Sequence, residues 1–209
     1  MFLIFSTVIF FSCSSNSPVI SETECSVVFY FDSRISLPSL GLTCYAKMVS
    51  PHDRVLALKL RHDETMLEWN ITEPIFLGDS EEVWIGSSKL NVPLHHSLPQ
   101  GDYTISVTDV AMESASRKIE LNYPENFCSM TLDEVESASE YQLFTSESFA
   151  IYDNQEKLLY FGTKISDFNS DAQILAFFPS ATNYRSFRFS PQLNTGLMLP
   201  PTYITGATQ

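Results

Sequence analysis

The fold is decided by residues 98–109, LPQGDYTISVTD, which place a turn directly before a strand. The proline and the glycine in this stretch are typical of a turn. Tyr103, Ile105 and Val107 then alternate with polar residues, which is the period of a strand with one buried face. The stretch therefore predicts a turn that leads into a half-buried β-strand.

Further short strands are predicted on both sides of this stretch. Each combines β-branched or aromatic residues with turn residues at its ends. They cover residues 27–31, 42–46, 55–60, 66–71, 83–85, 89–92 and 118–123. Short strands at this spacing, with no helix between them, indicate a mainly β protein built on an antiparallel sandwich.

The GDY step that ends in Tyr103 resembles a turn of immunoglobulin-like and fibronectin III-like domains. In those domains the tyrosine hydroxyl anchors the corner, so the resemblance implies that Tyr103 is a structural anchor. Immunoglobulin domains place a cysteine where Ile105 stands, and Trp69 lies too far beyond Cys44 for the usual spacing. The resemblance therefore implies an Ig-like or fibronectin III-like sandwich over residues 25–124 without the inter-sheet disulfide.

A change of composition after Pro124 predicts a domain boundary. Residues 125–147 contain six acidic residues and no basic one. Thr131, followed three residues later by Glu134, matches the capping box of a short helix. We therefore expect a smaller β-rich domain at residues 125–209 with at most one short helix.

The rest of this second unit is predicted to be β-structure. Residues 150–162 form a hairpin around a polar turn, and residues 173–178 and 185–189 are two further strands. The tail from Thr195 onward is expected to be extended and partly mobile. In the alternative organisation, the hairpin adds strands to the first sheet and makes one larger domain.

The N-terminus resembles a bacterial lipoprotein signal, because the apolar segment 2–11 ends in Ser12-Cys13 before a polar run. The resemblance implies a signal peptide at 1–12, a palmitate-type lipid anchor on Cys13 and a tether at 13–24. It also implies export and anchoring in the bacterial envelope, on the periplasmic or surface side of the outer membrane. The missing basic residues and the bulky Phe10-Phe11 resemble the looser spirochaete-type pattern. An ordinary cleaved signal and a misassigned start are the alternatives.

Three cysteines remain if Cys13 carries lipid. Cys25 and Cys44 flank the first two predicted strands and are the preferred disulfide couple in an oxidising envelope, which leaves Cys128 unpaired. Buried free thiols are an equal alternative.

The composition and the motifs indicate no nucleic-acid, metal or catalytic site. A net charge of −13, with 12 basic residues, argues against nucleic acid and against docking on anionic lipid. The calcium-loop pattern that starts at Asp167 lacks its glycine and its bidentate glutamate, and His95-His96 point to opposite faces of a strand. We therefore predict no catalytic residue, no metal and no cofactor.

The aromatic residues Tyr184, Phe187 and Phe189 can form a platform for sugar or peptide, although core packing is the simpler interpretation. The leading hypothesis is a lipid-anchored, non-enzymatic envelope protein in binding or scaffolding. Its partner would be another envelope protein, a host protein or a glycan. A small-ligand carrier and a degenerate enzyme, each built on the C-terminal domain, are the alternatives.

Overall fold

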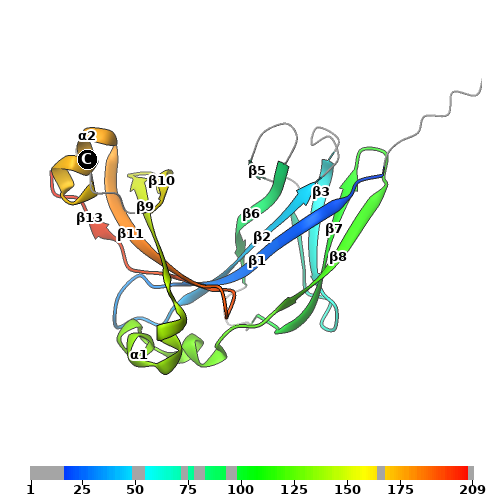
Figure 1. Ribbon diagram of the computed structural model, residues 1–209, viewed down its shortest axis with the longest axis horizontal. Helices are drawn as coiled ribbons and strands as arrows, with labels where there is room; N and C mark the ends of the chain where they lie inside the picture. Colours follow the sequence, from blue (N-terminus) through cyan, green and yellow to red (C-terminus); the bar gives the residue numbers. More distant parts are fainter. Residues whose placement is uncertain are drawn as a thin grey trace, which may run out of the picture.

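The computed structural model describes residues 17–48, 55–71, 75–77, 83–92, 98–163 and 168–206. This part of the chain forms a long sheet, a short sheet and four short helices (Figure 1). The prediction of a mainly β protein is confirmed. The sequence predicted separate strands at residues 83–85 and 89–92, but these residues belong largely to one strand, Val83–Asn91. Between the two segments, the register of its pairing with the neighbouring strand shifts.

The long sheet has nine strands and the short sheet has four. Across the long sheet the order is β10 (Leu158–Gly162), β9 (Ser146–Asp153), β11 (Ala181–Ser190), β12 (Thr195–Met198), β1 (Ile20–Tyr30), β2 (Ser39–Met48), β6 (Val83–Asn91) and β5 (Ile75–Leu77), with β13 (Thr202–Tyr203) beside β11. Across the short sheet it is β4 (Glu68–Ile71), β3 (Val55–His62), β7 (Gly101–Asp109) and β8 (Ser114–Leu121).

The long sheet is continuous from one half of the chain to the other. The tail from Thr195, predicted to be partly mobile, instead forms β12, whose four residues are all buried. It pairs in parallel with β1, with Val27 opposite Thr195 and Tyr30 opposite Met198. A four-residue strand that pairs across most of the chain carries no local pattern, which explains why the sequence did not reveal it. The domain boundary predicted after Pro124 stays a prediction.

The two faces of the long sheet have different surroundings. We call convex the face that carries Val27 and Phe29, which pack with Leu58 and Tyr103 of the short sheet in the main core. The opposite face, which we call concave, carries Tyr30 because successive side chains of a strand point to opposite sides. The sheet curls so that its end strands β5 and β10 stand on either side of the open concave face (Figure 1).

The segment after Pro124 covers part of the convex face. It folds into the 3-10 helix η2 (Glu125–Ser129), the α-helix α1 (Leu132–Ser137) and the 3-10 helix η3 (Ser139–Leu143). Phe127, Leu132 and Val135 are fully buried in the main core. Residues beyond the predicted boundary therefore supply part of the main core.

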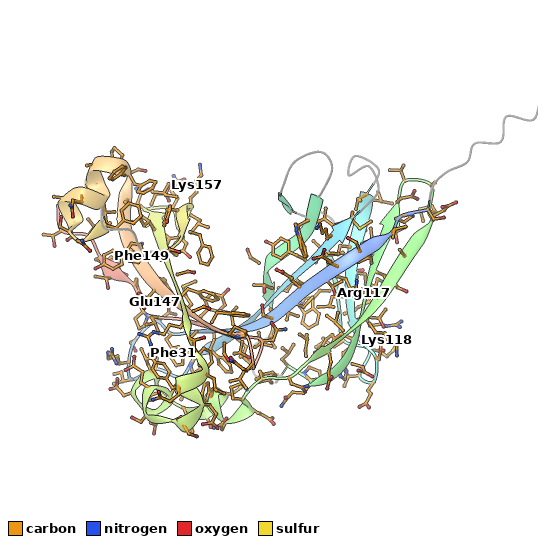
Figure 2. All side chains as sticks on the ribbon, viewed as in Figure 1. Phe31, Arg117, Lys118, Glu147, Phe149 and Lys157 are labelled. Carbon is orange, nitrogen blue, oxygen red and sulfur yellow. The ribbon has the colours of Figure 1, made fainter. Side chains whose placement is uncertain are left out.

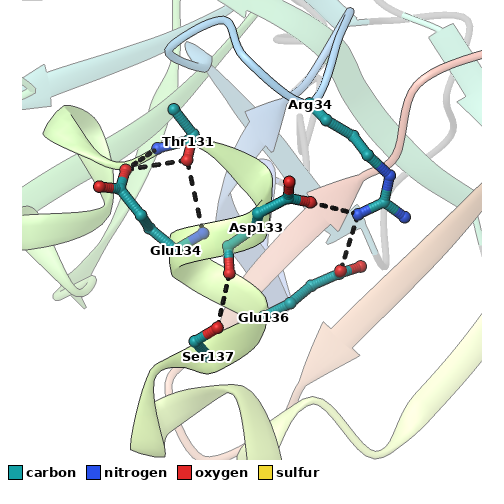
Figure 3. A network of polar contacts seen from close by, with 6 residues as sticks. All are labelled: Arg34, Thr131, Asp133, Glu134, Glu136 and Ser137. Atoms are coloured by element: carbon teal, nitrogen blue, oxygen red, sulfur yellow. Dashed lines mark hydrogen bonds and ion pairs between the residues drawn. The ribbon is translucent and has the colours of Figure 1, made fainter.

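Helix α1 begins with the predicted capping box. The Glu134 carboxylate accepts a hydrogen bond from the Thr131 backbone N–H at 2.7 Å, and Thr131 Oγ1 accepts one from the Glu134 N–H. Arg34, in the loop after β1, donates to Asp133 at 2.6 Å and to Glu136 at 2.9 Å (Figure 3). These contacts fix the helix against the end of β1.

A second helix corrects two predictions. Residues 173–178 were predicted as a strand, but they fall largely within the helix α2 (Asp171–Phe177), so the limit of one short helix is also wrong. Ser170 caps this helix by accepting from the Gln173 backbone N–H at 3.3 Å, and such a cap favours helix over strand. Ile174 packs with Phe149 in a second core (Figure 2). This core lies on the convex side of the long sheet, at the part formed by β9 and β11.

Strand β1 begins at Ile20, inside the segment 13–24 that was predicted as a tether. The β-structure therefore starts closer to Cys13 than the sequence indicated.

Candidate binding site on the concave face

A cleft of about 520 Å³ lies on the concave face. It is formed where β9, β11, β12, β1 and β2 run side by side in the long sheet, together with the loops that follow β1 and β9. Its apolar wall includes Leu40 and Met198, and its polar groups are Tyr30, Asp32, Tyr152, Glu156 and Arg185.

Arg185 is the central donor of this cleft. Its side chain is 14% exposed, and its Nη1 donates to Oδ1 of Asp32 at 3.4 Å, although Asp32 itself is 76% exposed. Within the described part of the chain, this carboxylate is the one hydrogen-bond partner of the guanidinium. A guanidinium has five N–H donors in a fixed fork, so most of them remain available to a ligand.

Two tyrosine hydroxyls flank Arg185. Burial raises the pKa of Tyr30 and of Tyr152, and the charge of Arg185 only partly offsets this rise. Both phenols therefore stay protonated at neutral pH and can donate and accept hydrogen bonds.

Glycines make room for aromatic rings on this face. A Cβ atom on Gly41 would come within 2.6 Å of the Tyr30 ring, and one on Gly196 within 2.5 Å of the Phe187 ring. Only glycine therefore leaves room for these two rings without a shift of the side chain. Each of these two rings therefore approaches its glycine closely, with an edge of the ring toward the sheet.

An aromatic stripe lies beside the cleft. Phe187 and Phe189 stack with their ring centroids 6.3 Å apart, and Phe161 of β10 lies 5.7 Å from Phe187. Phe161 is 52% exposed. Phe187 pairs with Met198, which lines the cleft, so the stripe adjoins it.

The structure separates the three aromatic residues that the sequence grouped together. Phe187 and Phe189 lie on the concave face, but Tyr184 points to the convex side, where its ring centroid is 4.7 Å from that of Phe149. The odd and even positions of one strand explain this split. Contact of these residues with a ligand stays a prediction.

Tyr103 lies in the main core and does not line the cleft. Its ring is fully buried and its hydroxyl donates to the Pro99 carbonyl oxygen at 2.6 Å. Burial raises the pKa of this phenol, so it remains a donor.

Cys25 and Cys44 stand directly opposite each other on β1 and β2 and are buried free thiols. A hydrogen bond to Cys25, together with burial, raises the pKa of Cys44. Opposed residues of an antiparallel pair have Cα atoms about 4.5–5.5 Å apart, which a disulfide can span. Their pairing stays a prediction.

Several sequence predictions fall outside the described residues, namely those on Cys13, His95, His96 and Asp167. The polar groups of the cleft were not among the residues predicted from the sequence. The alternation of Arg185, Phe187 and Phe189 was the available signal, because it places all three on one face of a strand. Nothing in the sequence indicated that Tyr30 and Tyr152 join them.

The fold and the cleft define a mainly β chain with a curled sheet and an open, polar and aromatic cleft on its concave face. No family model, no curated protein and no solved structure matches the chain. Over the residues described, no group of three or more His, Cys, Asp or Glu side chains is arranged to hold a metal ion. No helix in the same residues has the length and apolarity to cross a membrane.

Proposed function

We propose that this chain is an exported, non-enzymatic binding protein, anchored by lipid on Cys13, whose concave cleft holds its ligand. The apolar segment before Ser12-Cys13 supports the anchor. The packing of β1, β2 and β6 against the short sheet, with Tyr103 at a corner, supports the assignment to an Ig-like or fibronectin III-like sandwich.

The ligand that best fits the cleft is a neutral, hydroxyl-rich molecule, namely a glycan. The observation that carries this proposal is the mixture of polar groups, in which Arg185 donates and Asp32 and Glu156 accept. Sugar hydroxyls do both, so each can find a partner there. One positive and two negative charges attract neither an anion nor a cation strongly.

The aromatic surface fits the same class of ligand. Sugar rings present C–H faces that pack against aromatic rings, and Tyr30 supplies an aromatic ring at the cleft. The stripe of Phe161, Phe187 and Phe189 extends the surface, which suits several linked sugar units. The cleft is open, whereas a carrier of small apolar molecules would enclose its cargo.

Calorimetric titration of the chain with three related probes tests the ligand class. The probes are chitotriose (neutral), the chitosan trisaccharide (cationic) and a hyaluronan tetrasaccharide (anionic). We expect chitotriose to bind best, with a Kd on the order of 1 mM or tighter. Absence of chitotriose binding, or a preference for a charged probe, would contradict the proposal.

Two arginines of the same strand supply a matched pair of variants. Arg185→Gln should weaken chitotriose binding about tenfold, because a charge-assisted donor at the cleft is lost. Arg188→Gln should leave binding unchanged, because Arg188 is on the convex side, 5.2 Å from the Tyr141 ring centroid. Equal effects of the two substitutions would show that the ligand does not contact the cleft.

The anchor is tested separately by metabolic labelling with a fatty-acid probe. The parent chain should be labelled and Cys13→Ser should not. Equal labelling of the two would rule out lipid on Cys13.

A further inference from the structure

One end of the two packed sheets carries exposed apolar side chains. Val110 and Met112, in the turn between β7 and β8, are 59% and 73% exposed. Leu56 of β3 is 50% exposed and lies beside this turn, because its neighbour Val55 pairs with Asp109. Contiguous exposed apolar side chains mark a surface that meets a protein or a membrane.

The turn that presents them is held in place by hydrogen bonds. Oδ1 of Asp109 accepts from the backbone N–H groups of Ala111 at 2.8 Å and of Glu113 at 3.0 Å. The Met112 N–H donates to the Asp109 carbonyl oxygen at 2.9 Å. The side chains of Val110 and Met112 are therefore held outward by an ordered turn, and little order has to be gained when they meet a partner.

The N-terminal segment of the chain leads to this same end. Ser17 Oγ donates to Oε2 of Glu113 at 2.6 Å, and the start of β1 lies beside the β7–β8 turn (Figure 1). Val19, two residues further on, is 54% exposed. Cys13 precedes Ser17 by four residues, which span at most about 14 Å. A lipid on Cys13 would bring the bilayer within that distance of the turn.

We infer that this end of the molecule rests on the membrane, with Val19, Leu56, Val110 and Met112 (the apolar tip) inserted at the boundary between headgroups and acyl chains. The inference rests on the proposed function through the lipid on Cys13. Interfacial insertion of this kind depends on buried apolar area. The net charge of −13 disfavours anionic lipid, so the partner is a zwitterionic bilayer.

The contact would also fix an orientation. A lipid on a short tether holds the chain near the bilayer but leaves it free to rotate. With the apolar tip inserted, the β3–β4 turn, which lies at the other end of the short sheet beside Asp102, points away from the membrane.

Two exposed methionines give a matched test of this orientation. Met112 in the tip and Met66 in the β3–β4 turn are 73% and 58% exposed, with φ angles of 64° and 61°. Each is replaced by Trp in the full, lipidated chain. The proteins are then reconstituted in phosphatidylcholine vesicles with plain or brominated acyl chains, since bromine quenches tryptophan at contact distance.

We expect brominated lipid to reduce the emission added by Met112→Trp roughly two-fold, and to leave that added by Met66→Trp unchanged. Fatty-acid labelling of each variant is measured in parallel. If labelling persists but Met112→Trp is unquenched, or both variants are quenched equally, the inference is overturned while the anchor stands. If labelling does not depend on Cys13, the anchor is wrong and the inference falls with it.

Discussion

The two faces of the long sheet differ in what lies against them, although the same strands make both. On β1, Phe29 points to the convex side and lies edge-on to Tyr123 and Phe127, with centroids 5.9 and 5.8 Å away. The next residue, Tyr30, points to the cleft. Alternation decides which face a residue occupies, but segments far along the chain decide whether that face is covered. Among the residues that the structure describes, none covers the concave face in this way, so this face is the one proposed for binding.

The largest effect should come from removing part of the cover of the convex face. A fragment of residues 17–124 loses Phe127, Leu132, Val135 and Phe144, all buried, whereas a fragment of residues 17–145 keeps them. Each loss of such a side chain costs about 2–5 kcal/mol, so the four together cost about 8–20 kcal/mol, which is as large as the 5–15 kcal/mol of a typical domain's stability.

We therefore expect the shorter fragment to be unfolded and the longer one to give the better-dispersed amide spectrum. Well-dispersed amide signals from the shorter fragment would show that the helical segment is not needed. They would also support the boundary near residue 124 that the sequence indicates.

Adjacent residues of β1 provide a direct comparison of the faces. Phe29→Ala should lower the free energy of unfolding by about 3–5 kcal/mol, because it leaves a cavity in the main core. Tyr30→Ala should cost only about 1–2 kcal/mol, since its ring borders an open cleft. Urea unfolding of both variants measures the difference. Equal losses would mean that the concave face is packed as tightly as the convex one.

Tyr103 separates ring burial from hydrogen bonding within the covered face. Tyr103→Ala should cost about 3–5 kcal/mol and Tyr103→Phe about 1 kcal/mol, the latter through the lost bond to the Pro99 carbonyl. Thermal unfolding of the two variants gives both values. A Tyr103→Ala chain that melts like the parent would contradict the anchoring role.

The smallest effect concerns the cap of helix α1. Thr131→Ala should cost about 1 kcal/mol. The hydrogen bonds from Thr131 lower the pKa of Glu134 below the ordinary 4.5, so its contribution is present above that value and is lost as the pH falls through the lowered pKa. Unfolding curves measured from pH 6 to 3 should show a weaker pH dependence for Glu134→Gln than for the parent. Identical pH dependence would show that the cap is not formed.

Much of the fold could be predicted from local patterns in the sequence. The alternation around Tyr103, the capping box at Thr131 and the hairpin at residues 150–162 all correspond to observed elements. These features depend on residues a few positions apart. The helix α2 was missed because a short apolar run does not distinguish helix from strand, and Ser170 was not recognised as a cap.

The candidate site was far less predictable. Phe187 and Phe189 were named, and the structure places them beside the cleft. The cleft itself depends on β12 inserting between β1 and β11, which brings Tyr30 next to Arg185 across 155 residues of chain. No local pattern encodes such a pairing, because its stability comes from burial within the sheet.

The most direct test of the account is to map bound chitotriose on the two faces by amide chemical-shift changes in the full chain. We predict shifts that saturate at Tyr30, Tyr152 and Arg185 on the concave face, with Tyr103 and Phe127 of the main core unaffected. Saturating shifts centred on the convex residues, or none at any of them, would contradict the assignment of the concave face as the binding surface.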